Sequence, residues 1–588
     1  MNKTSKSNIN IIGIIKSPGF LFLVISLCIS FWVGKNVPPT WSVEKVTIDV
    51  KTDNEGKLFY VFRGKPTYIQ NIIDYEDAVL APGSLELINK NSETPSTTEE
   101  YVYHKNKDLY YHLVAKKHWR FWSLLPAFVA IVLCWITKEP LTSLLGGIVA
   151  GALILGQYNI TETVLVENLA AKNAAGVLVL YLWLLGGLMG IWCRTGAADA
   201  FARFMTEKFV KGPKSAKLVS WFLGVVFFQG GTISTVLVGT TVKPISDKQN
   251  ISHEELSYIV DSTASPIASL LAFNAWPGYI QAFIFVSGVS WLATESDRIA
   301  FFFKSIPFCF YAMFAVLGTF LLSIEKAPFI GKKMREAIKR SRTTGELDAP
   351  GANPLSAKNL QSSIVPEGYK PHVVDFFVPL LTLIGTAIGT FIYKGSPEVR
   401  WAFALAVLVA MVLAMIRGMS LTELIYGIGE GLKGVVLGSV ILLLAVVVGA
   451  VSKEVGGALY LVDMLGEKLP YWLLPVCLQL LTMIISFSIG TSWGTYAVSF
   501  PLAMPLSWAV ANSAGVEHPM LFMMICFAAV LDGSVYGDQC SPISDTTVLS
   551  SMCTGCDLMD HVKTQMPQAT IAAVIAAVLW TVVTIIFI

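Results

Sequence analysis

The stretch Tyr536-Gly537-Asp538-Gln539-Cys540-Ser541-Pro542-Ile543-Ser544-Asp545-Thr546-Thr547 places two aspartates and several hydroxyl residues beside an apolar segment that begins near residue 518. Proline lacks a backbone N–H and clashes with the preceding helical turn, so Pro542 breaks a helix. A broken helix frees backbone carbonyls, which can line a cavity together with hydroxyl side chains. We therefore predict an interrupted helix with a polar site at the break.

A second Ser-Pro-Ile occurs in the first half of the chain and belongs to a repeat. Ser265-Pro266-Ile267 matches Ser541-Pro542-Ile543, and Gly231-Thr232 matches Gly490-Thr491. Further matches in the same order pair Thr161-Glu162 with Thr422-Glu423, Gly190 with Gly449, and Pro307 with Pro567. The offset stays near ~260 residues, which is typical of a transporter built from two related halves.

The composition places most of the chain in a membrane. Of its 588 residues, 54% are hydrophobic and only 14% are charged, which leaves too little polar surface for a soluble protein. Apolar runs of about 20 residues cross a bilayer as helices. The net charge of +2 gives no reason to expect a nucleic-acid partner. The predicted spans and interrupted regions are 119–137, 141–156, 175–193, 216–247, 258–290, 301–323, 374–393, 399–416, 434–452, 470–511, 518–550 and 567–588.

Basic loops orient these spans, because short loops rich in Lys and Arg stay in the cytoplasm. Loop 194–217 and linker 324–372 are both basic. Both fall on the cytoplasmic side if 216–247 is a re-entrant hairpin. Each half then has an odd number of crossings, which inverts the second half relative to the first. With an N-terminal anchor, we predict an all-α inverted-repeat transporter of about eleven crossings and two re-entrant hairpins, with the N-terminus cytoplasmic and the C-terminus extracytoplasmic.

Five segments follow from this division. Residues 1–34 form a cytoplasmic N-terminus and an anchor; a cleaved signal peptide is the alternative, although no convincing cleavage site follows the apolar run. Residues 35–117 are polar and strand-like, which predicts a small β-rich domain outside the cytoplasmic membrane, acting as a stalk or lid. The remaining segments are the first repeat (118–323), the cytoplasmic basic linker (324–372) and the second, inverted repeat (373–588).

Four polar breaks supply the candidate ion or substrate ligands. Hard cations such as Na⁺ bind oxygen, and a carboxylate inside an apolar segment costs about 3 kcal/mol to insert, so it usually serves an ion or proton path. The candidate ligands are Thr232, Ser234 and Thr235; Asp261 and Ser265; Thr491, Ser492 and Thr495; and Asp538, Ser541, Asp545, Thr546 and Thr547. Asp532 is a candidate proton carrier. One carboxylate that exchanges a proton for Na⁺ suffices for antiport, and Asp538 and Asp545 are the favoured pair.

Some polar residues have structural explanations that require no bound ion or metal. Asp261 serves equally well as a cap of a half-helix beside Ser-Pro. Asp557, Asp560 and His561 are expected at a solvated cytoplasmic helix end. Cys553 and Cys556, with Cys540 and His561 nearby, resemble a metal motif, but small residues at a helix end explain them better. The glycines of Gly427-Ile428-Gly429-Glu430-Gly431 are expected to allow close helix packing, with Glu430 at an interface.

The long motif also resembles a known family. The run from Gly537 to Ser551, continuing to Cys556-Asp557 and His561-Val562-Lys563-Thr564-Gln565-Met566-Pro567, is similar to the signature of NhaC-type Na⁺/H⁺ antiporters, and Gly490-Thr491-Ser492-Trp493-Gly494-Thr495 matches that family's earlier glycine-threonine motif. The resemblance covers about 119–588 and implies the ion transporter superfamily fold, with paired re-entrant hairpins and often a dimer. Gln539 stands where the family pattern has His, and residues 35–117 are an insertion.

These observations favour a Na⁺(Li⁺)/H⁺ antiporter of the bacterial inner membrane. The alternative is a Na⁺- or H⁺-coupled carrier of a small organic solute, since the family resemblance includes such carriers. An organic acid would want a cationic pocket, and the breaks contain no Lys or Arg. A sensor would need a cytoplasmic output domain, and an enzyme would need a nucleophile–base pair or a histidine-rich metal set. We expect no resident cofactor, no metal beyond transported Na⁺, and as partners Na⁺, H⁺, membrane lipid and a second copy of the chain.

Overall fold

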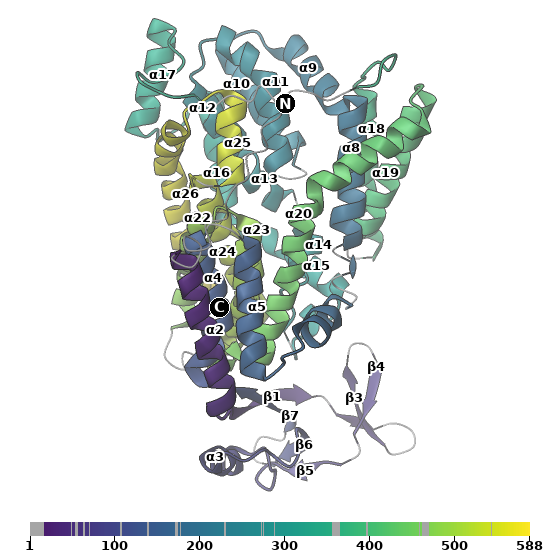
Figure 1. Ribbon diagram of the computed structural model, residues 1–588, viewed down its shortest axis with the longest axis vertical. Helices are drawn as coiled ribbons and strands as arrows, with labels where there is room; N and C mark the ends of the chain where they lie inside the picture. Colours follow the sequence, from purple (N-terminus) through teal and green to yellow (C-terminus); the bar gives the residue numbers. More distant parts are fainter. Residues whose placement is uncertain are drawn as a thin grey trace, which may run out of the picture. The chain divides into compact units, whose positions relative to one another are not determined.

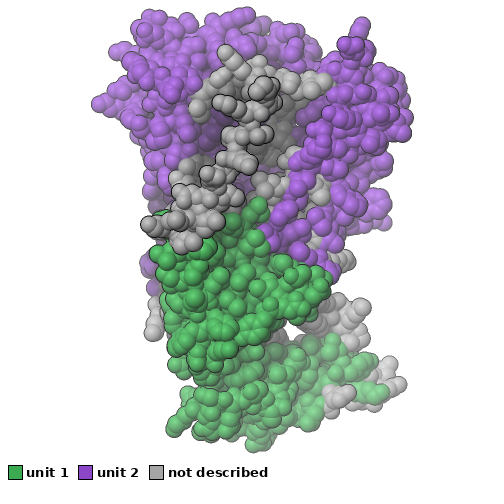
Figure 2. Space-filling view, in the orientation of Figure 1, with its two compact units in different colours: residues 1–168, 447–463 green, residues 169–446, 464–588 purple. Residues whose placement is uncertain are grey.

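The chain is mostly helical and forms two compact units, residues 1–168 with 447–463 and residues 169–446 with 464–588 (Figure 2). The computed structural model describes residues 17–588 apart from 49, 53–56, 63–64, 70, 106–108, 138–139, 171–174, 177, 229–230, 272, 275, 287, 355–364, 395–397, 458, 461–469 and 543. The five segments predicted from the sequence stay a prediction.

The strands of the first unit lie between Thr40 and His118, where the sequence predicts a β-rich region (Figure 1). Side chains alternate along the last strand, so Tyr111, Leu113 and Ala115 face a small core. The strands are β1 (Thr40–Ile48), β2 (Lys51–Thr52), β3 (Leu58–Phe62), β4 (Lys65–Tyr68), β5 (Ile73–Asp74), β6 (Glu99–His104) and β7 (Leu109–His118). They form one sheet in the order β1-β7-β6-β5, in which only the β5–β6 pair is parallel, and a second sheet in the order β2-β3-β4.

The helices of the first unit begin with the apolar segment that the sequence predicts to be an anchor. Ser17 caps this helix by accepting a hydrogen bond from the Phe20 N–H at 3.3 Å, and Pro18 stands at the first helical position, where its missing N–H costs nothing. The helices are α2 (Pro18–Asn36), α3 (Pro82–Asn91), η1 (Arg120–Leu124), α4 (Leu125–Thr137), α5 (Pro140–Leu155), the π-helix η2 (Ile160–Val166) and α6 (Glu167–Leu169), which runs into the second unit.

The second unit holds the remaining helices. They are the π-helix η3 (Leu178–Leu185), α8 (Gly186–Thr195), α9 (Ala197–Phe209), α10 (Pro213–Val226), α11 (Gly231–Lys248), α12 (His253–Ser262), α13 (Ser265–Leu270), α14 (Trp276–Ile280), η4 (Ser290–Leu292), α15 (Glu295–Ser305), η5 (Ile306–Phe308), α16 (Phe310–Ser323), α17 (Lys332–Thr344), α18 (Val374–Lys394), α19 (Val399–Ile416), α20 (Leu421–Glu454), η6 (Tyr471–Leu473), α22 (Leu474–Ile489), α23 (Ser492–Ser513), α24 (Pro519–Cys540), α25 (Asp545–Thr554) and α26 (Leu558–Phe587). Of these, α20 extends into the first unit.

Helices end or begin at all four predicted polar breaks. The second break separates α12 from α13, the third separates α22 from α23, and the fourth separates α24 from α25, whereas residues 231–235 of the first break lie within the first turns of α11. Pro266 stands in the first turn of α13, where the absent N–H is tolerated. Gly490 ends α22 with φ +74°, a left-handed conformation that glycine adopts without strain. The second, third and fourth breaks are therefore confirmed.

Fewer helices than predicted are long enough to cross a membrane unbroken. Six described helices qualify by length and hydropathy, and eight candidates result if each of two bent pairs counts as one span. Region 258–290, expected as one crossing, contains the short helices α13 and α14 instead, because Pro266 and Pro277 each start a new helix. The chain is a multi-pass membrane protein, while the number of crossings and the inverted repeat stay predictions.

The glycine cluster on α20 lies against α8, as expected for close packing. A Cβ at Gly431 would overlap the carbonyl oxygen of Gly186 and lie 2.7 Å from the Cα of Gly190, and a Cβ at Gly427 would lie 2.7 Å from the Cβ of Arg194. Small residues four apart on both helices let the two backbones touch. Glu430 is exposed and pairs with Lys433 of the same helix at 2.7 Å, so it lies outside this contact.

A cluster of charged side chains joins the start of α12 to the chain that follows α17. His253 lies 2.7 Å (Nδ1) from Asp348 and 3.2 Å (Nε2) from Asp247, and its backbone N–H donates to Leu347. Lys243 also lies 3.2 Å from Nε2. Burial works to lower the pKa of His253, but the hydrogen bonds to the two carboxylates outweigh it, so the pKa is raised above its usual 6.5.

Gly431→Leu is expected to destabilise the second unit, because the new side chain would meet backbone atoms that cannot rotate away. Overpacking costs about 1–3 kcal/mol, and contact with backbone predicts the upper part of that range. Thermal unfolding in detergent measures the change. Gly429→Leu is the matched control, since nothing lies within 4 Å of a Cβ at that position. Equal melting temperatures for the two variants would contradict the packing account.

Docking of residues 347–348 on α12 is expected to weaken as the pH rises. A histidine whose pKa is raised by folding stabilises the folded contact below its unfolded pKa of about 6.5, and this stabilisation is lost as the pH passes the raised value. Amide hydrogen exchange of residues 345–350, corrected for the intrinsic rate, should therefore rise severalfold above that value. His253→Gln should remove the pH dependence, and an unchanged profile in this variant would sink the prediction.

Candidate functional site

Asp538 is the centre of a hydroxyl-lined site in the second unit. The residue is 2% exposed and lies in the last turn of α24. Its Oδ2 accepts hydrogen bonds from Ser265 at 3.1 Å and Ser492 at 2.9 Å, and its Oδ1 accepts one from Ser544 at 2.6 Å. All three donors are neutral, so these contacts leave the negative charge of the carboxylate without a counter-charge.

Three helix breaks bring these donors together. Ser265 begins α13, Ser492 begins α23, and Ser544 immediately precedes α25. Each hydroxyl thus stands at a helix N-terminus, where the partial positive charge of the helix dipole favours an anion. Through these three contacts the second, third and fourth breaks meet at one carboxylate. Asp538 and its donors come from both predicted halves of the chain.

Asp261 forms a second polar centre near the end of α12. Its Oδ2 lies 3.1 Å from Nε2 of His561, accepts a hydrogen bond from Gln565 Nε2 at 3.0 Å, and is 3.5 Å from the Thr547 hydroxyl. Asp261, His561, Gln565 and Thr547 are all fully buried. His561 and Gln565 lie four residues apart on α26, so both face α12 from one side of that helix.

The position of His561 corrects the sequence interpretation. We expected His561 beside Asp557 and Asp560 at a solvated helix end, but His561 has no exposed surface. Asp557 caps α26 by accepting hydrogen bonds from the N–H groups of Met559 and Asp560, and several of the residues that follow, beginning with His561, are buried in the protein. The signal in the sequence was the pair His561 and Gln565 at helical spacing, which places two polar side chains on one face.

Thr547, Gln539 and Gln565 connect the two centres. The Thr547 hydroxyl lies within reach of Asp261 and also 3.3 Å from the Asp538 carbonyl oxygen and 3.0 Å from that of Gln539. Gln565 donates from the same nitrogen to Asp261 and, at 2.5 Å, to the Gln539 carbonyl oxygen. The Gln539 side chain donates to Ser262 at 2.6 Å and accepts from Tyr311 at 2.5 Å. A continuous buried network therefore joins Asp261 to Asp538.

Asp532 lies in the same helix as Asp538 but has a different environment. Its Oδ2 accepts the backbone N–H of Tyr311 at 2.8 Å, in the first turn of α16. The first N–H groups of a helix lack partners within that helix, so a carboxylate brought by another helix can satisfy one of them. This contact accounts for buried Asp532 as a cap of α16.

The remaining candidate ligands differ in how far they are buried. Asp545 is exposed and begins α25, where its side chain accepts the Thr546 N–H at 3.0 Å. Thr546 lies 3.0 Å from the Ser544 hydroxyl, and Ser541 is buried. Thr495 donates to the carbonyl oxygen of Thr491 at 2.9 Å. Buried residues of α11 include Ser234 and Thr235, whereas the side chain of Thr232 lies outside the described part of the structure.

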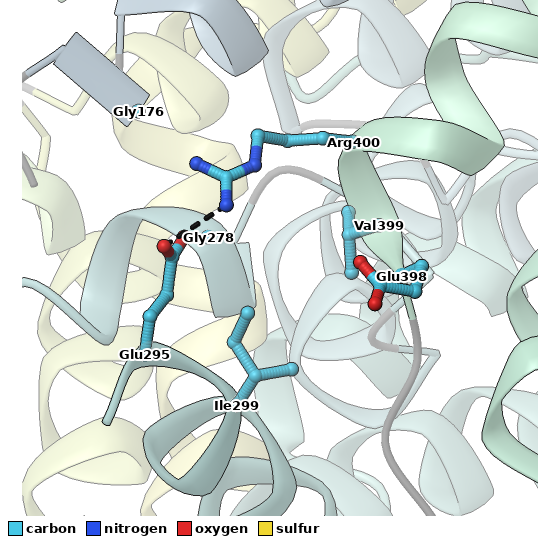
Figure 3. A pocket seen from close by; sticks show the side chains of 7 residues that line it. All are labelled: Gly176, Gly278, Glu295, Ile299, Glu398, Val399 and Arg400. Carbon is cyan, nitrogen blue, oxygen red and sulfur yellow. Dashed lines mark hydrogen bonds and ion pairs between the residues drawn. The ribbon is translucent and has the colours of Figure 1, made fainter. Parts of the chain in front are cut away.

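A hollow elsewhere in the second unit contains a salt bridge. It measures about 30 Å³ and is lined by Gly176, Gly278, Glu295, Ile299, Glu398, Val399 and Arg400. Figure 3 shows the Arg400 guanidinium pointing at the Glu295 carboxylate, and Nη2 of Arg400 lies 2.9 Å from Oε2 of Glu295. The charges of Arg400 and Glu295 compensate each other, and none of the residues predicted from the four breaks lines this hollow.

The chain is similar in sequence to a known family and to several known proteins. A family model described as the Na⁺/H⁺ antiporter family matches residues 276–585, which include Asp538, Asp532 and His561. An uncharacterized protein of Haemophilus influenzae is 29% identical over 474 residues, covering 77% of this chain and 88% of that protein. The malate-2H⁺/Na⁺-lactate antiporter of Bacillus subtilis is 29% identical over 223 residues, covering 36% of this chain and 43% of that protein.

A solved structure shares the fold at low sequence identity. The YdaH transporter of Alcanivorax borkumensis, whose crystal structure has an unusual topology, superposes with a TM-score of 0.50 and 14% identity. The match covers 78% of this chain and 98% of that chain. This likeness concerns the fold alone.

Asp532→Asn is expected to preserve stability, because the amide oxygen can still accept the Tyr311 N–H. Asp532→Leu leaves that N–H buried without an acceptor, which costs about 1–3 kcal/mol. Thermal unfolding of the purified protein in detergent compares the two variants. A melting temperature for Asp532→Leu equal to that of Asp532→Asn would show that the cap of α16 does not depend on this contact.

Proposed function

Because the chain belongs to the Na⁺/H⁺ antiporter family, as its resemblance to NhaC-type antiporters indicated, we propose that it exchanges cytoplasmic Na⁺ or Li⁺ for external H⁺. The exchange is secondary active transport, driven by the proton gradient and not by a chemical reaction of the protein. The family model covers just over half of the chain and includes the helices that carry Asp538 and His561.

The single observation that carries this proposal is the buried carboxylate of Asp538 within a ring of three hydroxyl groups. An isolated buried carboxylate is costly when ionised, so it binds either a proton or a cation. Serine hydroxyls and a carboxylate are oxygen ligands of the kind that hard cations prefer. Since one carboxylate cannot hold both ions at once, Na⁺ and H⁺ would occupy Asp538 alternately, and this competition couples their movements.

The other candidates take supporting roles in this proposal. Ser265, Ser492 and Ser544 would turn their hydroxyl oxygens toward the ion, with Ser541, Thr491, Thr495, Thr546 and Thr547 completing the lining of the breaks. Exposed Asp545 would attract cations to the mouth of the site, and buried Asp261 would act as a second carboxylate in the path. For Asp532 we favour the capping role, and proton transfer by this residue is the alternative that the transport rate of Asp532→Asn tests.

The membrane arrangement is part of the same proposal. We expect about eleven crossings with two re-entrant hairpins, in which the second repeat is inverted relative to the first. The charge of the basic loops supports an N-terminus in the cytoplasm of a bacterium and a C-terminus outside its inner membrane. The strands between Thr40 and His118 would then stand outside the cytoplasmic membrane. The working form would be a homodimer.

A second candidate is a Na⁺- or H⁺-coupled carrier of a small organic solute. A relative that this chain resembles over part of its length bears the name malate-2H⁺/Na⁺-lactate antiporter. His561 and Gln565 also add donors to a region that the sequence suggested lacked any cationic group. A carboxylate substrate bound near these donors would fit this alternative, and the transport experiment separates the two.

Purified protein in proteoliposomes with an imposed pH gradient tests the function. We expect Na⁺ or Li⁺, but not choline, to dissipate the gradient. Failure of every alkali cation, together with uptake of labelled malate or lactate under a Na⁺ gradient, would replace the antiporter by the organic-solute carrier.

Asp538→Asn should reduce this cation-driven flux at least a hundredfold, because the amide can neither carry a proton nor balance a cation. Asp545→Asn should mainly raise the KM for Na⁺, since that carboxylate is exposed. The matched control is Asp199→Asn on α9, which loses only a surface pair with Arg203. Normal flux through folded Asp538→Asn would remove this residue from the site.

A further inference from the structure

Two adjacent glutamates at the start of α12 are buried, although glutamate is almost never fully buried without a partner. Glu254 is 2% exposed and Glu255 has no exposed surface. Carboxylates in the first turn favour the helix dipole, and Ser252 caps the same turn by accepting the Glu255 N–H at 3.2 Å. A pair of buried carboxylates nevertheless requires cations close by.

The cations come from two other segments. Lys217 of α10, 1% exposed, lies 2.9 Å from Glu255 and 3.3 Å from Glu325. Arg340 of α17 donates to both carboxylate oxygens of Glu254, at 2.8 Å and 2.9 Å. Arg342 of α17 lies 4.0 Å from Glu255. The two buried glutamates of α12 are thus balanced by cations of α10 and α17.

Hydrogen bonds that involve main-chain groups also hold α17 and the residues after it against the start of α12. The Leu347 carbonyl oxygen accepts the His253 N–H at 3.2 Å and the Arg340 guanidinium at 3.0 Å. Arg342 donates to the carbonyl oxygen of Gln249 at 3.3 Å, just before α12. Main-chain acceptors fix the position of α17 along α12 more closely than side-chain charges alone.

The same segment contacts a second helix of the site. The Asn353 N–H donates to Asp557 at 3.0 Å, and Asp557 is the residue that caps α26. Residues 325–353 therefore hold the N-terminal ends of both α12 and α26. Asp261 of α12 and His561 of α26 are the residues that meet in the core at 3.1 Å. Asp261 lies seven residues beyond Glu254, about 10 Å along the helix.

We infer that residues 325–353, between the two predicted halves, position α12 so that Asp261 meets α26, and that Arg340 is a positioning residue for ion exchange. The inference rests on the proposed transport function. Arg340 acts through Glu254 and the body of α12 and touches no ion. One guanidinium nitrogen, Nη2, reaches both oxygens of the buried carboxylate and the Leu347 carbonyl oxygen, while Nε donates to the Glu346 carbonyl oxygen at 3.2 Å. The planar guanidinium is therefore held between α12 and the chain that follows α17, with more donors than a lysine ammonium could direct to these positions.

Na⁺-driven H⁺ flux in proteoliposomes tests the inference. Arg340→Ala should raise the KM for Na⁺ about tenfold in folded protein, and Arg340→Glu should be more impaired because it places two carboxylates together. The double exchange Glu254→Arg with Arg340→Glu should recover most of the wild-type KM. Lys339→Ala is the matched control, since this neighbour on α17 is exposed. A wild-type KM in Arg340→Ala would overturn the inference and leave the proposed function standing.

A second measurement does not depend on transport. The hydroxyls of Ser257 on α12 and Thr554 on α25 lie 2.6 Å apart, so cysteines at both positions should cross-link when α12 is correctly placed. With Cys553 and Cys556 replaced by alanine, Arg340→Ala should lower the cross-linking yield severalfold and the double exchange should restore it. An unchanged yield would reject the positioning role, whereas absence of cation-driven flux in the wild-type protein would reject only the proposed function.

Discussion

The carboxylate of Asp538 is nearly excluded from solvent and receives hydrogen bonds from three serines but no salt bridge from them. Hydroxyl donors reduce the cost of burying the charge without cancelling it, since hydrogen bonds alone do not neutralise a carboxylate. The helix breaks around it follow from this requirement, because each places a hydroxyl or a helix N-terminus at the carboxylate. A set of unbroken apolar helices could not supply those groups.

The rest of the second unit divides into parts that fix the site and parts that leave it adaptable. The crossing of α8 and α20 brings glycine backbones into contact, and such a contact has no side chain that could change rotamer. Around Asp261 and Asp538, by contrast, many contacts are made by serine, threonine and glutamine side chains, which can both donate and accept hydrogen bonds. The second unit thus combines close backbone packing between α8 and α20 with a polar site built from side chains that can donate and accept hydrogen bonds.

Sequence reasoning located the breaks well because their causes are local. Pro266 and Pro542 remove helix hydrogen bonds wherever they occur, and Gly490 adopts a conformation that few other residues tolerate. The repeat places Ser265 and Asp538 in corresponding breaks of the two halves. It does not identify them as hydrogen-bond partners, since 273 positions separate them in the chain. His561 was misplaced because Asp557, a true helix cap, suggested solvent for its neighbours, while burial of α26 depends on packing that the sequence does not display.

The bond between Asp261 and His561 joins residues 300 positions apart, and this separation matters during synthesis. At about 5–20 residues per second, a ribosome needs roughly 15–60 s to reach His561 after it has made Asp261. Throughout that interval α12 already carries its carboxylate, while α26 has yet to emerge. Until α26 arrives, Asp261 in the newly made first half lacks the contacts with His561 and Gln565 that it has in the folded protein. The arrival of α26 therefore completes a polar core that earlier segments could not close, and a chain truncated before α26 would present the quality-control machinery with an unsatisfied acid inside its apolar body.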